Sequence, residues 1–162
     1  MSDNKTNAMR TLDARKIPYQ VFTFSPDIHS AAGVAEVVGL PPQQVYKTLV
    51  VLRSQGKPML IMIAGDLELD LKRVAKAVGE KKVRMASHKE AEALTSLQVG
   101  GISALALLNR PFEVFIDRPA TDLSHLLASA GKRGINLRLA VPDLMRVTRA
   151  RIIEATEPAE HS

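Results

Sequence analysis

Cysteine is absent from this 162-residue sequence. That absence excludes disulfide bonds, zinc sites built from thiolates and a catalytic cysteine nucleophile. The four histidines, His29, His88, His125 and His161, are far apart and form no HxxxH or HEXXH pattern. We therefore expect no metal site.

Long apolar runs are missing as well. No stretch reaches the roughly 18 apolar residues that a membrane span requires, and the first ten residues, MSDNKTNAMR, lack the apolar centre of a secretory signal. We expect no membrane association and a cytoplasmic location. The chain also has no internal repeat and no low-complexity linker, which favours one domain over residues 1–162, with loose ends at about 1–5 and 156–162.

What the sequence does contain is typical of a globular protein with a basic surface. Hydrophobic residues make up 46% of the chain and charged residues 24%, and the net charge is +5. Many basic residues fall in 70–84 and 130–138, where apolar residues separate them. This spacing indicates a folded basic face, which either binds the phosphates of a polyanion or is an inert surface.

The hydrophobic pattern and the turn residues predict an irregular mixture of helices and strands. A first helix, capped by Asn4 or Thr6, should run to about Arg15, and Ser87 should cap another helix with Glu90 in a capping box. Further helices are expected within 30–40, 68–79 and 141–148, and strands within 16–25, 81–86, 112–117 and two hairpins, 44–65 and 125–140. The lack of a regular βαβ order predicts the α+β class, with a curved and largely antiparallel or mixed sheet.

Lys47 is unusual for its position in the expected strand VYKTLVVL. On an ideal strand it shares one side with the apolar Val45, Leu49 and Val51. Such a lysine either extends its amine past the strand end into solvent, which is the more conservative interpretation, or lies in a cleft. In a cleft, the ammonium could bind a carbonyl, a carboxylate or a phosphate.

Paired glycines open the segment VGGISALALLNR, residues 99–110. Gly100 and Gly101 form either an ordinary tight turn or a place where bare main-chain N–H groups hold an oxyanion. The sequence GISAL is not the GxSxG of a serine hydrolase. Two further segments have ordinary alternatives: SAGKRG, 129–134, suits phosphate contact or a solvated hairpin tip, and the acidic DLELD, 66–70, suits a helix cap better than a cation site.

Five segments in order resemble the YbaK/EbsC family of free-standing aminoacyl-tRNA deacylases, which is related to the editing domain of bacterial prolyl-tRNA synthetases. They are KIPYQVFTF, QVYKTLVV, LDLKRVAKAVGEKKVRMA, QVGGIS and SAGKRGINLRLAVPDL, and the resemblance covers about 8–147. It implies a mixed, curved, barrel-like β-sheet flanked by helices, and a central pocket with no metal or other cofactor. The implied activity is hydrolysis of the ester between tRNA and a wrongly attached amino acid, above all cysteine on proline tRNA.

The resemblance also implies roles for individual residues. Lys47 matches the active-site lysine of the family, and Gly100 and Gly101 match its GGI loop, so these three are the expected catalytic residues. The implied substrate-binding residues are Phe24, Thr48, Ile102, Ser103, Ser129 and Asn136, and the implied tRNA-binding residues are Lys72, Arg73, Lys76, Lys132 and Arg133. The implied partners are aminoacyl-tRNA, bound by its acceptor end, and prolyl-tRNA synthetase.

Two departures from the family pattern leave the specificity open. ALALLNR follows Ser103 where many relatives have a proline, a glycine and basic residues, which could change the pocket shape. Phe24 stands where cysteine-specific relatives often have tyrosine. The alternatives are therefore a deacylase for alanine or serine, an inactive tRNA-binding or synthetase-binding module of the same fold, and a small-molecule esterase.

Overall fold

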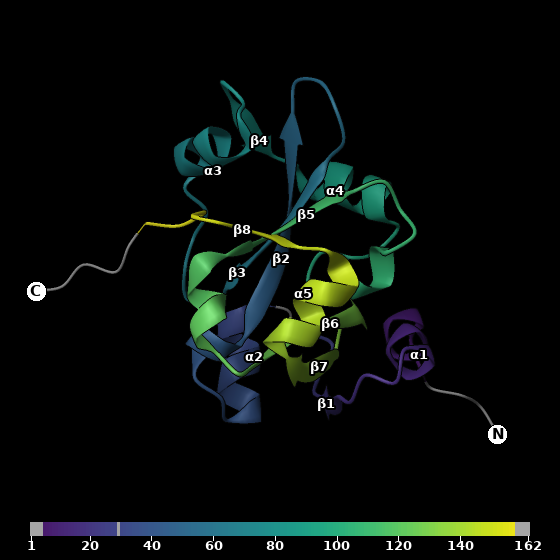
Figure 1. Ribbon diagram of the computed structural model, residues 1–162. Helices are drawn as coiled ribbons and strands as arrows, with labels where there is room; N and C mark the ends of the chain where they lie inside the picture. Colours follow the sequence, from purple (N-terminus) through teal and green to yellow (C-terminus); the bar gives the residue numbers. More distant parts are fainter. Residues whose placement is uncertain (1–4, 29, 158–162) are drawn as a thin grey trace, which may run out of the picture.

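The computed structural model describes residues 5–28 and 30–157 (Figure 1). The histidines at 29 and 161 and the alternative helix cap Asn4 lie outside these ranges. Within them, no helix is long and apolar enough to cross a lipid bilayer.

The strands form two sheets. The five-stranded sheet has the order β4 (Val83–Met85), β2 (Tyr46–Arg53), β3 (Met59–Ala64), β5 (Glu113–Asp117) and β8 (Arg151–Ile153). In this sheet β2 is antiparallel to β3 and β4, whereas β5 is parallel to β3 and β8. The three-stranded antiparallel sheet has the order β1 (Gln20–Thr23), β7 (Ile135–Ala140) and β6 (His125–Lys132).

These pairings confirm the expected α+β class, the mixed sheet and both hairpins. They differ from the expected barrel-like sheet, because the described strands divide into two sheets and do not close. A parallel bridge between Val45 and Leu127 joins the start of β2 to β6. Farther along β2 the two sheets are not paired.

Four of the five described α-helices begin at caps that the sequence predicts, and α5 has no side-chain cap. They are α1 (Asn7–Ala14), α2 (Ala31–Val38), α3 (Leu71–Val78), α4 (His88–Thr95) and α5 (Val141–Thr148), with short 3₁₀ helices η1 (Pro42–Gln44), η2 (Leu105–Leu107) and η3 (Arg118–Asp122). Thr6 and Ser30 cap α1 and α2, and Ser87 and Glu90 form the capping box of α4. Asp70 accepts hydrogen bonds from the first amides of α3, which confirms the cap interpretation of DLELD.

Alternate residues of β2 contribute to two different hydrophobic clusters. Tyr46 and Val50 pack in the large core with β6, β7, α1 and α5. Val51 packs on the opposite side with Val74 and Ala75 of α3. Figure 1 shows α3 and β4 at one end of the molecule, and α2 and β1 at the other.

The end of the chain is more ordered than the sequence predicts. After α5 the chain forms β8, which was not among the expected elements, and pairs with β5. Beyond it, the buried carboxylate of Asp117 accepts a hydrogen bond from the Ala155 amide at 2.8 Å and one from the Thr156 hydroxyl at 2.5 Å. Thr156 is only 7% exposed, so the expected loose end at 156 is wrong at its first residue.

Candidate functional site

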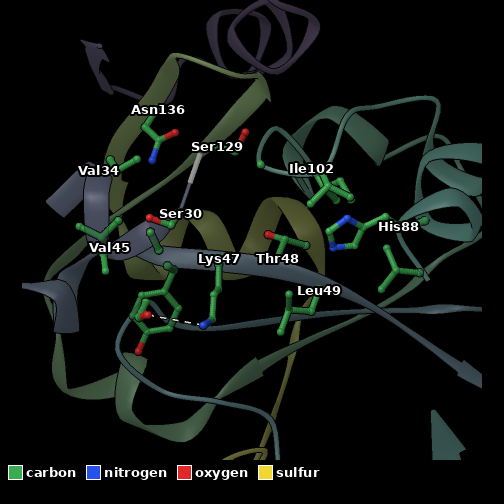
Figure 2. Close-up of a pocket in the computed structure, with 18 of the residues that line it drawn as sticks. Ser30, Val34, Val45, Lys47, Thr48, Leu49, His88, Ile102, Ser129 and Asn136 are labelled. Atoms are coloured by element: carbon green, nitrogen blue, oxygen red, sulfur yellow. Dashed lines mark hydrogen bonds between the residues drawn. The ribbon is translucent and has the colours of Figure 1, made fainter. Parts of the chain in front are cut away.

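A cavity of about 280 Å³ lies beside β2, where the two sheets separate (Figure 2). Its walls come from six regions of the chain: the start of α2, β2, the residue that follows β3, the turn into α4 with the start of that helix, the glycine loop and the β6–β7 hairpin. The polar and glycine residues that line it are Ser30, Tyr46, Lys47, Thr48, Gly65, His88, Gly100, Ser129 and Asn136. Aliphatic side chains, among them Val34, Val45, Leu49 and Ile102, complete the lining.

Lys47 is half-buried at this cavity. Its Nζ donates one long hydrogen bond, of 3.5 Å, to the carbonyl of Gly65. Figure 2 shows the amine turned toward that carbonyl and away from Ser129 and Asn136. The geometry fits the cleft interpretation, and since an ammonium has three donors, it leaves donors for a bound ligand.

The two glycines of the loop have different positions. Gly100, with a φ of 93°, lines the cavity. Gly101 is buried and does not line it, and its amide donates to the carbonyl of Gln98 at 2.8 Å. That amide is therefore already bonded within the turn, so the prediction of an oxyanion contact stays open for Gly100 and not for the Gly101 amide.

Gly101 is nevertheless required by the packing of the loop. A Cβ at this position would lie 2.9 Å from the amide nitrogen of Arg133 and 3.1 Å from the carbonyl carbon of Lys132. The Arg133 side chain holds the same junction, because its Nε donates to the Val99 carbonyl at 2.6 Å. The glycine loop thus packs directly on the main chain of the β6–β7 hairpin.

Four of the six predicted substrate-binding residues line the cavity, namely Thr48, Ile102, Ser129 and Asn136. The other two do not. Phe24 packs in the apolar cluster beneath α2. Ser103 is 1% exposed, and its hydroxyl accepts a hydrogen bond from the Ala106 amide at the start of η2. Phe24 and Ser103 therefore contribute to packing and to the start of η2, and we do not retain them as substrate contacts.

Asn136 and Ser129 face each other across β7 and β6. Asn136 is 7% exposed, and its side-chain amide forms no hydrogen bond with the described residues. Figure 2 shows this amide pointing into the cavity. The Ser129 hydroxyl accepts from the Gly131 amide at 3.1 Å, beside the bulge between Ser129 and Lys132, and keeps its own proton available.

The predicted tRNA-binding residues lie outside the cavity lining. Lys72 and Lys76 of α3 and Lys132 of the hairpin are exposed. Arg73 is half-buried and pairs with Asp70, with 3.5 Å between Nε and Oδ2. Because the Arg133 guanidinium is partly engaged by the glycine loop, the exposed lysines are the better candidates for phosphate contact.

Much of the lining was not selected from the sequence as site residues, and Ser30, Gly65 and His88 are three such residues. Ser30 was expected only as a helix cap, yet it also lines the cavity. A Cβ on Gly65 would lie 2.5 Å from the Cβ of Ala31, so this glycine allows α2 to approach the end of β3. The exposed imidazole of His88 lies near Ile102 in Figure 2. The only sequence feature that indicated the position of His88 was the predicted helix cap at Ser87, which places His88 at the start of a helix.

Charged groups fix the start of α4, which carries His88 into the cavity wall. The Arg84 guanidinium binds both carboxylate oxygens of Glu90, at 2.8 and 2.9 Å. This contact, with the amide of Ser87, lowers the pKa of Glu90 to about 2. Among the described residues, no three histidine, aspartate or glutamate side chains gather in a way that could hold a metal ion.

Tyr46 has a hydroxyl without a hydrogen-bond partner among the described residues. Burial raises the pKa of this phenol, and the nearby carboxylates Asp117, Asp66 and Asp122 raise it further. The hydroxyl is therefore a neutral group in the core.

The segment that departs from the family pattern turns away from the cavity. Ala104, Leu105 and Leu107 are buried in the large core, and η2 contacts α1 and α5. No residue from Ser103 to Arg110 lines the cavity. The residues after Ser103 that differ from the family pattern therefore do not change the lining of the cavity.

Comparison with known proteins gives a consistent result. The family model described as "Aminoacyl-tRNA editing domain" matches residues 25–147. A relative from Enterococcus faecalis, named "Putative Cys-tRNA(Pro)/Cys-tRNA(Cys) deacylase EbsC", is 38% identical over 157 residues, covering 96% of this chain and 95% of the relative. The proline–tRNA ligase of Acidithiobacillus ferrooxidans is 33% identical over 78 residues, which are 48% of this chain and 14% of the ligase.

A solved structure shares the fold over almost the whole chain. It is titled "Crystal structure of a putative trans-editing enzyme for prolyl tRNA synthetase", and its TM-score is 0.82 at 24% identity. The match covers 96% of this chain and 100% of the other.

Proposed function

Because this chain belongs to the aminoacyl-tRNA editing domain family, we propose that it hydrolyses the ester between tRNA and a wrongly attached amino acid, with cysteine on proline tRNA as its main substrate. One observation carries the proposal. Lys47, the glycine loop at Gly100, and Ser129 and Asn136 come from distant parts of the sequence and line a single cavity, with the Lys47 ammonium at the Gly65 carbonyl. The relative of 38% identity, whose printed name specifies cysteinyl-tRNA, supports the choice of amino acid.

The residues of the cavity suit the chemistry of an activated ester. Such an ester needs positioning and stabilisation of the developing oxyanion more than a strong nucleophile. We assign to Lys47 the positioning of the ester and one contact with the developing charge, and to the main chain at Gly100 a second contact with that charge. With a cysteinyl ester, the substrate thiol can attack its own carbonyl carbon, and the ester C–O bond then breaks with the proton passing to the ribose oxygen. Water then opens the cysteine thiolactone and gives the free amino acid. Such an intramolecular step has a large effective molarity.

Docking of the tRNA acceptor arm is assigned to the exposed lysines. Lys72 and Lys76 of α3 and Lys132 of the hairpin offer compact charges for phosphates, without base contacts. Prolyl-tRNA synthetase is the proposed protein partner, because the ligase match covers about half of this chain. Co-sedimentation of the two purified proteins, with and without tRNA, tests that association.

The test of the function is a deacylation panel. Purified protein is mixed with proline tRNA charged with cysteine, alanine or serine, and the release of amino acid is followed. Cysteine should be released fastest, and Lys47→Ala should lower the rate by roughly a hundredfold or more, since one group that contacts developing charge contributes about 2–4 kcal/mol. Lys57→Ala, an exposed lysine in the β2–β3 turn, is the matched control.

Each alternative gives a different result in the same panel. No release from any charged tRNA, together with salt-sensitive tRNA affinity, would identify a binding module. Faster release from a simple aminoacyl ester than from charged tRNA would identify a small-molecule esterase. A full rate for Lys47→Ala would reject the assigned mechanism while leaving the reaction in place.

A further inference from the structure

One edge of β2 is unpaired for a short stretch inside the cavity. β3 pairs with β2 along the opposite edge. On the cavity edge, Leu127 bridges Val45 at one end, and β4 pairs from Val51 at the other, with the Ala86 amide donating to the Val50 carbonyl at 3.0 Å. Between these two points, no strand of the described chain pairs with this edge.

The register determines which main-chain groups face this gap. In an antiparallel ladder, successive residues turn their N–H and C=O groups toward alternate edges. The Val45 carbonyl accepts a hydrogen bond at 2.7 Å from the amide that follows β3, whereas the Val50 carbonyl accepts on the β4 side. Both contacts place the main-chain groups of Lys47 and Leu49 toward β3 and those of Thr48 toward the cavity.

We propose that the amide and carbonyl of Thr48 hold the aminoacyl group of the substrate by main-chain hydrogen bonds, an inference that rests on the proposed function. An aminoacyl ester has an ammonium donor and a carbonyl acceptor on neighbouring carbons. This is the pattern that one residue of an added antiparallel strand would present to the edge. The Thr48 carbonyl accepts from the ammonium, and its amide donates to the ester carbonyl oxygen.

The inference divides recognition between two walls of the cavity. The main chain of Thr48 contacts groups that every amino acid has, so it gives affinity without choosing among amino acids. Ser129 and Asn136 lie in the wall formed by β6 and β7, where the Asn136 amide has no hydrogen-bond partner among the described residues. Both can contact the substrate side chain, which differs between amino acids. Positioning and selection of the amino acid are then separable by mutation.

A proline at position 48 tests the amide directly. Because the Thr48 N–H lies outside the β2–β3 ladder, Thr48→Pro removes no ladder hydrogen bond, whereas Leu49→Pro removes one. Thr48→Pro should therefore fold, and Leu49→Pro should melt at a much lower temperature. Thr48→Val keeps the N–H, so we expect Thr48→Pro to lose roughly tenfold more deacylation rate than Thr48→Val.

Nuclear magnetic resonance of the unaltered protein provides a test that needs no variant. The ligand is adenosine that carries alanine through a 3′ amide in place of the ester, so it is not hydrolysed. On titration, the Thr48 amide resonance should move more than those of Lys47 and Leu49. The N-acetylated ligand, which lacks the ammonium, should bind at least roughly tenfold more weakly.

The outcomes separate this inference from the proposed function. Shifts at Gly100 and Asn136 without a distinct shift at Thr48 would overturn the inference, even if deacylation is observed. A Thr48 shift in a protein that hydrolyses no charged tRNA would support the contact and reject the catalysis. Absence of any shift in the cavity would overturn the inference, and the deacylation panel would then decide the function by itself.

Discussion

Replacing Gly101 by alanine should weaken the protein at the junction of the glycine loop and the β6–β7 hairpin. The added methyl would lie 2.9 Å from the Arg133 amide nitrogen and 3.2 Å from the Lys132 Cα, and main-chain atoms cannot turn aside as a side chain can. Overpacking of this kind costs about 1–3 kcal/mol of the free energy of unfolding. In a domain of this size each kcal/mol lowers the melting temperature by roughly 2–4 °C.

The loop displaced by this methyl also carries Gly100, so the deacylation rate should fall together with stability. Gly79→Ala is the control, because its Cβ would meet nothing within 4 Å and its φ of 78° alone makes alanine unfavourable, by about 1–2 kcal/mol. It should lose stability and keep its rate. Urea unfolding measures the free energy, and charged proline tRNA measures the rate.

A Gly101→Ala protein of unchanged stability that has lost activity would refute this reasoning. It would show that the glycine serves the cavity directly, despite the hydrogen bond of its amide to Gln98. Gly101→Val should be more damaging to the fold than alanine, since valine adds two further carbons at the same contact.

Three further predictions concern the capping box, the buried phenol and the basic helix. Glu90→Gln should destabilise the protein at neutral pH. The pKa of Glu90 is lowered from 4.5 to about 2, so its carboxylate contributes to the free energy of unfolding above pH 4.5, and this contribution is lost as the pH falls toward 2. The unfolding curves of the parent and the variant should therefore converge near pH 2. Tyr46→Phe should leave the free energy of unfolding unchanged or raise it, because the hydroxyl has no partner among the described residues, and a loss above about 1 kcal/mol would indicate a hydrogen bond. Replacing Lys72 and Lys76 by alanine should make the slope of log tRNA affinity against log salt concentration less steep by roughly one unit per lysine. Lys57→Ala should leave this slope unchanged. Equal slopes for the parent, the Lys72 and Lys76 variant and Lys57→Ala would place the tRNA elsewhere.

Local chemistry made much of the fold predictable. Ser30, Asp70 and Ser87 each accept hydrogen bonds from the first amides of their helices, and these contacts need no information from the rest of the chain. The strand β8 was not predictable in this way. It has three residues and pairs with β5, which lies more than 30 residues earlier in the sequence.

The site residues also divide into those that the sequence predicts and those that only tertiary packing brings to the cavity. The position of Lys47 in its strand, together with the family resemblance, was enough to select it and the neighbouring Thr48. Gly65 and His88 reach the cavity because segments distant in sequence pack together, as in the close approach of Gly65 to Ala31. No periodicity or local motif records such contacts, so the lining could be only partly predicted.

The attachment of residues after α5 to the central sheet determines where the chain can be shortened. If β8 is removed, β5 becomes an edge strand with unpaired main-chain groups, and the Asp117 carboxylate loses the two donors that it binds while buried. Open strand edges recruit other chains. A truncation at residue 148 should therefore give a protein that associates or precipitates, whereas a reporter protein joined after residue 157 leaves all of these contacts in place.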